Sequence, residues 1–214
     1  MHFFQESPPF EMGTTLKGTQ TLDGTTSTIN ESILGTRCAF QDVNYATSAS
    51  TRALLSGEKI LAIALRNTSG ITLLPKRLVR LDLTAGRGML KNADGYSVLL
   101  AHSPVVLVDP FLPSAGVADD DIFWGLYSGP ALCLTPAVAA DFNTAIVAGS
   151  PLVAATGSTS GNSTGGRVAN VTLPGQTGDT RSLSNAIGLV GWALSSRTTD
   201  ITNSDILVKL GLRV

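Results

Sequence analysis

The sequence is poor in charge, in histidine and in cysteine. Of its 214 residues only 14% are Asp, Glu, Lys or Arg, and the formal net charge is -1 at pH 7. Soluble domains average about a quarter charged residues. The near-neutral balance gives no electrostatic basis for binding nucleic acid, so we expect no direct contact with it. The two histidines and two cysteines show none of the spacings that metal ligands need, and we expect no metal or other cofactor.

Long apolar runs are missing too. None approaches the roughly 20 residues that a membrane-spanning helix needs, so no membrane contact is expected. The first ten residues contain neither a basic stretch nor an apolar core, and we expect no secretory signal there. In that setting Cys38 and Cys133 are expected to be reduced, partly buried thiols, with a disulfide between them as the alternative.

What the sequence does contain is a series of short apolar runs of β type, set off by Gly, Pro, Ser and Thr. Such runs are typical of small β-barrels and β-sandwiches. We therefore expect a mainly β fold, a compact barrel or sandwich of short strands with little helix. The expected strands cover residues 37–43, 59–66, 77–83, 97–101, 104–109, 131–134, 145–148, 151–155, 167–169, 186–194 and 206–210.

Between these strands, Asn92–Gly95 has the composition of a turn. The segment 119–127 is expected to end at Gly129-Pro130. Short helices are options only over residues 47–55 and after Thr135, where a capping residue precedes a proline.

Residues 1–36 differ from the rest of the chain. They show no sustained period of 2 or 3.6, and Thr, Gly and Ser dominate after the first dozen positions. Too few large apolar residues are present to close a core. We expect an extended N-terminal arm over 1–36, followed by one β-rich domain over 37–214.

The tip of the arm gathers aromatic residues. Phe3, Phe4 and Phe10 surround Pro8 and Pro9. Because such a cluster is costly to leave in water, these five residues are candidate anchors on a partner. A frayed terminus is an equally weighted alternative.

Three motifs suggest phosphate binding, catalysis or calcium binding, but each lacks the residues or spacing that the function needs. The Gly-rich stretch 157–166 lacks the Gly-Lys-Ser/Thr of a phosphate-binding loop, which favours a plain linker. His102 has no nucleophile motif near it and is expected to be a satisfied histidine. The run Asp119–Asp121 lacks the spacing of a calcium loop, so a solvated turn is favoured.

The two tryptophans are expected to differ. Trp192 lies inside an apolar strand pattern and is expected in the core. Trp124, beside Phe123 and Tyr127, is better placed for an exposed platform, although core or subunit interface is favoured over ligand binding even there.

The second half of the chain has a distinctive order of segments: Gly129-Pro-Ala-Leu-Cys-Leu134, Val147-Ala-Gly-Ser-Pro-Leu-Val-Ala154, Gly166-Arg-Val-Ala169, Ile187-Gly-Leu-Val-Gly-Trp-Ala-Leu194 and Ile206-Leu-Val-Lys-Leu210. This order resembles that of the small β-rich decoration (cement) proteins of tailed-phage heads. The likeness covers roughly residues 129–214 and more faintly 58–83. Two features depart from it: Ser150 stands at a commonly acidic turn position, and the arm and the 157–166 loop enlarge the chain.

The resemblance implies a non-enzymatic virion protein, assembled in the host cytoplasm. It would sit on the outer surface of an icosahedral head, often as a homotrimer. There it would bind the major capsid protein and stabilise its lattice, many weak contacts adding up through avidity. On this interpretation the candidate anchors at the tip of the arm, Phe3, Phe4, Pro8, Pro9 and Phe10, would contact the capsid.

Three other functions stay open. The chain could be a different virion part, such as a fibre, a head–tail protein or a coat protein. It could be a carbohydrate-binding module with Trp124 and Tyr127 as the platform. It could also be a β-fold hydrolase that uses His102 with one of Asp119–Asp121.

Overall fold

A computed structural model describes residues 7–45, 54–82, 90–96, 104–135, 145–154, 165–170, 189–197 and 204–212. Within them the chain is mainly β, with one short 3-10 helix, η1 (Glu31–Ile33), which confirms the expected fold class. The strands are β1 (Thr19–Leu22), β2 (Thr25–Thr28), β3 (Arg37–Val43), β4 (Leu54–Asn67), β5 (Leu78–Leu81), β6 (Asn92–Tyr96), β7 (Val105–Val108), β8 (Ile122–Leu134), β9 (Pro151–Ala154), β10 (Val168–Asn170), β11 (Leu189–Ala193) and β12 (Asp205–Gly211).

Five strands close on themselves as a small barrel. β4 pairs with β8, β8 with β7, β7 with β5, β5 with β6, and β6 returns to β4 through a short parallel ladder. All the other ladders in this circuit are antiparallel. Closure leaves these strands without free edges, which β-proteins otherwise have to protect.

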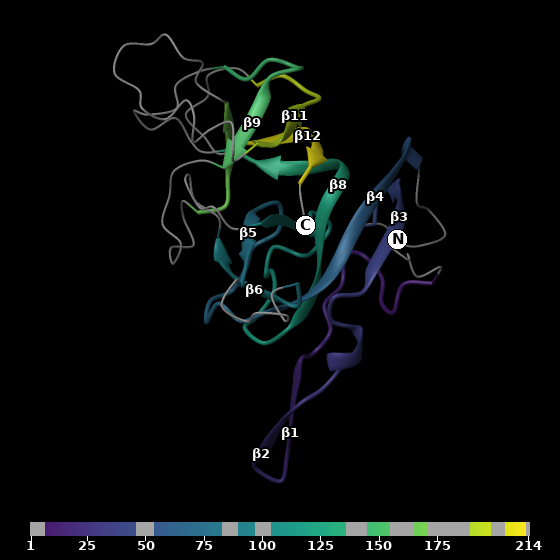
Figure 1. Cartoon of the computed structure of the whole chain (residues 1–214), viewed down its shortest axis with the longest axis vertical. Coiled ribbons are helices and arrows are strands. Elements are labelled where there is room, and N and C mark those ends of the chain that lie inside the picture. Colours follow the sequence, from purple (N-terminus) through teal and green to yellow (C-terminus); the bar gives the residue numbers. More distant parts are fainter. Residues whose placement is uncertain are drawn as a thin grey trace.

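β8 belongs to the barrel and also to the part of the same ten-stranded sheet that extends beyond the barrel. Its first half pairs with β4, and its second half pairs with β12, from which the order continues to β11, β9 and β10 (Figure 1). The expected end at Gly129-Pro130 is wrong, because the strand runs through both residues. Gly129 has φ 104, and a Cβ there would lie 2.5 Å from the carbonyl oxygen of Lys59 on β4. The glycine therefore lets the strand bend close to its neighbour instead of ending.

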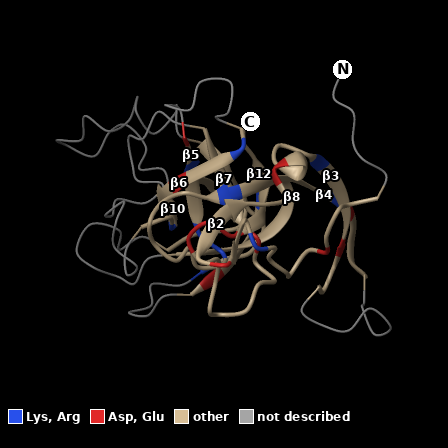
Figure 2. Ribbon diagram, turned by 90° about the horizontal axis from the view of Figure 1, so that it is seen from below, with Lys and Arg blue, Asp and Glu red and all other residues tan. Residues whose placement is uncertain are grey.

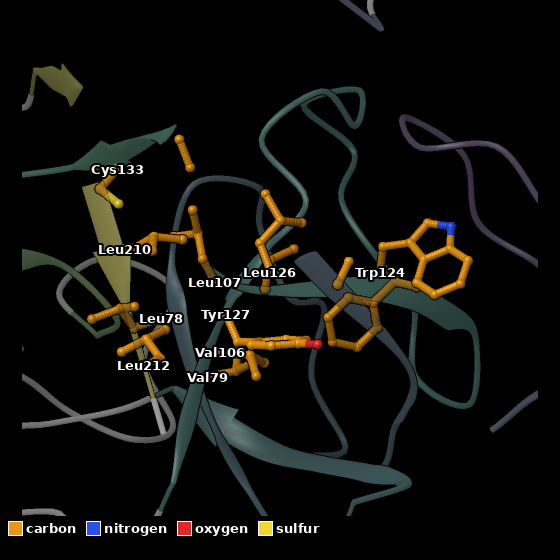
Figure 3. Close-up of a cluster of buried hydrophobic side chains, with 14 of the residues drawn as sticks. Leu78, Val79, Val106, Leu107, Trp124, Leu126, Tyr127, Cys133, Leu210 and Leu212 are labelled. Carbon is orange, nitrogen blue, oxygen red and sulfur yellow. The ribbon is translucent and has the colours of Figure 1, made fainter. Parts of the chain in front are cut away.

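The core fills the barrel and extends under the part of the sheet formed by β12, β11, β9 and β10. Figure 3 shows this cluster, with Leu107 and Leu126 of the barrel near Leu210 of β12. Cys38 and Cys133 are both buried and unpaired, which confirms the expectation of free thiols. Burial raises the pKa of both thiols, so neither has the character of a reactive cysteine.

The N-terminal segment packs on the barrel at the start of β8. The Phe10 ring stacks on Trp124 at 4.5 Å between centroids, and Met12 is also buried. Leu16 forms two backbone hydrogen bonds with Ile122, of 2.9 and 2.7 Å. Part of the predicted arm therefore contributes to the chain's own core, and residues 1–6 lie outside the described residues.

After this docked segment the chain forms a projecting hairpin. β1 and β2 pair in regular antiparallel register, and Figure 1 shows them extending away from the barrel, at the end opposite to β9, β11 and β12. The two loop residues have positive φ, 50 at Asp23 and 77 at Gly24. This is the turn geometry that matches the natural twist of a two-residue hairpin.

One predicted turn is a strand. Asn92–Gly95 forms most of β6, which pairs with β5 on one side and with the end of β4 on the other. The residues have the local preference for a turn, but pairing with β4 and β5 holds them in an extended strand that closes the barrel. The helix expected over 47–55 lies outside the described residues except for its last two positions, which begin β4, and the one after Thr135 lies wholly outside them.

Candidate protein-binding face

The five predicted anchor residues have different surroundings. Pro8 and Pro9 are exposed, whereas Phe10 is only 8% exposed. The backbone oxygen of Phe10 also accepts a hydrogen bond of 3.2 Å from Trp124 Nε1. Phe10 therefore anchors the N-terminal segment on this chain's own barrel. Phe3 and Phe4 lie outside the described residues.

The structure confirms the favoured expectation for one tryptophan and contradicts the expectation for the other. Trp124 is fully buried and Tyr127 nearly so, which places Trp124 in the core and rules out the alternative of a sugar platform at these residues. Trp192 is half exposed rather than in the core. Trp124 is covered because β8 has the barrel interior on one face and the N-terminal segment on the other.

The acidic run is a structural turn in part. Asp119 and Asp120 are exposed, and Asp119 Oδ1 accepts a 2.8 Å hydrogen bond from the backbone of Gly70. Asp121 is buried and pairs with Lys17 at 3.0 Å, which fastens the N-terminal segment. Within the described ranges no three His, Cys, Asp or Glu side chains come together as metal ligands. His102 lies outside them.

One carboxyl group is deeply buried beside the N-terminal segment. Asp109 Oδ2 accepts a 2.5 Å hydrogen bond from the backbone of Gly13, and Oδ1 accepts one of 2.9 Å from Phe111. Burial raises the pKa of Asp109 to about 6, and the two amide donors oppose this rise only in part. Asp109 thus connects the end of β7 to the docked segment.

This carboxyl group gives a pH-dependent stability. Folding holds the Asp109 proton more tightly than the unfolded chain does, since the pKa rises from 3.8 to about 6. The contribution of Asp109 to the free energy of unfolding is therefore greatest below about pH 4. It declines as the pH rises through 6 and then levels off, so that about 3 kcal/mol is lost in total. Urea unfolding of wild type and Asp109→Asn at pH 4, 5, 6 and 7 measures it. A constant difference in unfolding free energy between the two proteins across this range would contradict the prediction.

Within the described residues, exposed apolar side chains form a row across three neighbouring strands. Leu132 of β8 is the register partner of Leu207 of β12, and the Leu194 N–H, just after β11, donates to the Leu207 carbonyl at 2.8 Å. Trp192 lies two residues before Leu194, so it projects to the same side of the strand. These four residues, 36–50% exposed, are called the apolar face below.

Ion pairs border the apolar face. Lys209, the register partner of Trp192, pairs with Glu58 of β4. Asp205, at the start of β12, pairs with Lys76. Elsewhere charge is sparse, and Figure 2 shows that most of the ribbon carries no charged residue. An apolar centre with a charged rim is the usual anatomy of a protein-binding surface.

Comparison with protein families, curated proteins and solved structures finds no match. Among the described residues, no helix is long and apolar enough to cross a membrane.

The apolar face leaves a signal in the sequence, a large apolar residue at a solvent-facing position of a strand. In Ile206-Leu-Val-Lys-Leu210 the alternation buries Ile206, Val208 and Leu210, so that Leu207 stands at a solvent-facing position. Leu132 of β8 is likewise exposed between the buried residues Ala131 and Cys133. A large apolar residue on the wrong side of an alternating strand predicts a contact outside the chain.

Proposed function

We propose that the chain is a structural virion protein that binds the outer surface of a tailed-phage head, without enzymatic activity. Its partner is the major capsid protein, and copies of the chain associate with one another, as a homotrimer in the family that the sequence resembles. The observation that carries the proposal is the apolar face, a surface built for contact with protein. The order of motifs over residues 129–214 supports the choice of partner.

The physical character of the chain supports the same function. A surface with little charge suits broad contacts whose strength comes from many copies, since avidity converts weak single contacts into a stable layer. The alternative virion roles share this character. A coat protein would form shells when purified alone, whereas a decoration protein requires a preformed head.

A charge placed in the apolar face tests the proposal. We expect Leu207→Asp to weaken binding to heads assembled from the major capsid protein of the same genome at least about thirtyfold, because an unpaired carboxylate is costly to bury. Co-sedimentation with undecorated heads measures this. A point substitution is preferable to deletion of the arm, which would remove Phe10 and Met12 from the core.

The matched control is Leu54→Asp. Leu54 is 63% exposed and lies at the start of β4, which is not one of the strands that carry the apolar face. This variant should bind heads as the wild type does. The proposal that the apolar face binds the head would be ruled out if wild-type protein failed to bind the heads, or if both variants bound them equally well.

A further inference from the structure

The β1–β2 hairpin is largely exposed, and its outer edges form no strand pairing with the rest of the described chain. All of β2 is exposed, and so are three of the four residues of β1. In the described part of the chain the two strands pair only with each other. An isolated two-stranded hairpin is marginally stable in water. A regular hairpin that projects from the body therefore points to a contact with another molecule.

The base of the hairpin is held firmly to the barrel. The Ile29 N–H donates to the Gly18 carbonyl oxygen at 2.8 Å. The buried Arg66 guanidinium donates to the carbonyl oxygens of Gly18 and Ile29, each at 3.4 Å. The Asn30 side-chain amide donates to the carbonyl oxygen of Lys17 at 2.9 Å. These hydrogen bonds fix the base of the hairpin on the barrel, so the hairpin projects in a defined direction.

The register shows which backbone groups face outward. Residues 18 and 29 form a hydrogen-bonded pair, so by alternation the pairs 20/27 and 22/25 are hydrogen-bonded too. The pairs 19/28 and 21/26 are not, and their N–H and C=O groups point away from the hairpin. The 2.9 Å contact between the Thr21 and Thr26 hydroxyls fits such a pair, in which side chains lie closer. The outer edge of β2 therefore presents Thr26 and Thr28.

This edge lacks the usual protection against pairing. Natural edge strands carry lysine, proline or a bulge, which discourage the addition of another strand. β2 reads Thr-Thr-Ser-Thr, without charge, and its ladder has no register shift. Threonine favours the extended backbone and keeps the strand soluble.

We propose that the hairpins of two copies of this chain pair edge to edge, β2 against β2, about a two-fold axis at Ser27. In this register Thr26 of each copy faces Thr28 of the other, and four outward N–H groups meet carbonyl oxygens. A two-fold contact places like residues together, which an uncharged strand permits and a charged one would oppose.

β2 suits this contact better than β1. Thr19 of β1 is only partly exposed, and Lys17 just before it is held by Asp121. The contact is small compared with stable dimer interfaces, so we expect a weak, concentration-dependent association that a surface lattice would strengthen. It is independent of the partner proposed for the apolar face.

Cysteine cross-linking of the full-length chain tests the register. Two Ser27 residues on the axis form a non-hydrogen-bonded pair with Cα atoms about 4.5 Å apart, within the range that a disulfide spans. We expect Ser27→Cys to form disulfide dimers at least about tenfold faster than Thr25→Cys under copper–phenanthroline oxidation, because pairing raises the effective thiol concentration. Thr25 is equally exposed on the same strand but would lie opposite position 29 of the other copy. The native thiols are buried and do not compete.

Proline identifies the bonds that hold the pair. Thr26→Pro with Thr28→Pro removes two outward N–H groups and leaves the bonds within the hairpin. In the Ser27→Cys background we expect this double change to abolish the rapid cross-linking, whereas Thr26→Ser with Thr28→Ser retains it. Circular dichroism verifies that each variant is folded. Equal cross-linking at positions 25 and 27, no cross-linking at either, or no effect of the prolines overturns the proposal.

Discussion

Trp124→Ala is expected to lower the free energy of unfolding by about 3–5 kcal/mol, the range for removing a large aromatic side chain from a core. The indole is fully buried, stacks on Phe10 at 4.5 Å and meets Phe40 edge to face at 5.1 Å. Its loss would also leave the Phe10 carbonyl without its indole donor. Urea unfolding followed by far-ultraviolet circular dichroism measures the effect.

The matched control is Trp192→Ala. This side chain is 50% exposed on the apolar face, so its removal should change the unfolding free energy by only about 0.5 kcal/mol. The same variant should still weaken binding to a partner that covers the face. If the two substitutions lowered the free energy of unfolding by similar amounts, the burial of Trp124 and the exposure of Trp192 would be contradicted.

Gly129→Ala is expected to cost about 2–5 kcal/mol, through backbone strain together with overpacking. The residue has φ 104, and an added Cβ would lie 2.5 Å from Lys59 O and 2.9 Å from Ile60 Cα. Both are backbone atoms of the adjoining strand β4, so neither can turn aside as a flexible side chain would. Thermal unfolding of the variant measures the loss.

Gly57→Ala provides the comparison for this change. Gly57 lies in β4, and an added Cβ there meets no atom within 4 Å. Alanine should be neutral or raise stability by up to about 1 kcal/mol, since it reduces the freedom of the unfolded chain. If Gly129→Ala behaved like Gly57→Ala, the close approach of β8 to β4 would be contradicted.

The strands with a clear apolar pattern, alternating or continuous, were predictable from sequence. β3 has the predicted bounds of residues 37–43, and β7 and β12 lie within one residue of their predictions at each end. In these strands the alternating or continuous apolar pattern reports burial directly. β6 was missed because its composition, Asn-Ala-Asp-Gly, is that of a turn, and only closure of the barrel makes it a strand.

Two features of the tryptophans could not be predicted, for a different reason: which residues cover Trp124, and that Trp192 is exposed. Phe10 and Trp124 are separated by 114 positions, and no local pattern indicates that an N-terminal residue will cover β8. Trp192 lies in an apolar strand whose outer face remains open. The pattern predicted a strand in both places, but which face is covered depends on partners distant in the sequence.

The double membership of β8 has a consequence for synthesis on the ribosome. The barrel strands lie between residues 54 and 134, so the ribosome has made all of them before it reaches β12. β12 is made well after β8, yet it lies between β8 and β11. Until β12 emerges, residues 128–134 of β8 lack the strand that covers their edge in the finished fold. An open edge of this kind invites pairing with other chains, so the nascent protein is most prone to aggregate between the synthesis of β8 and that of β12.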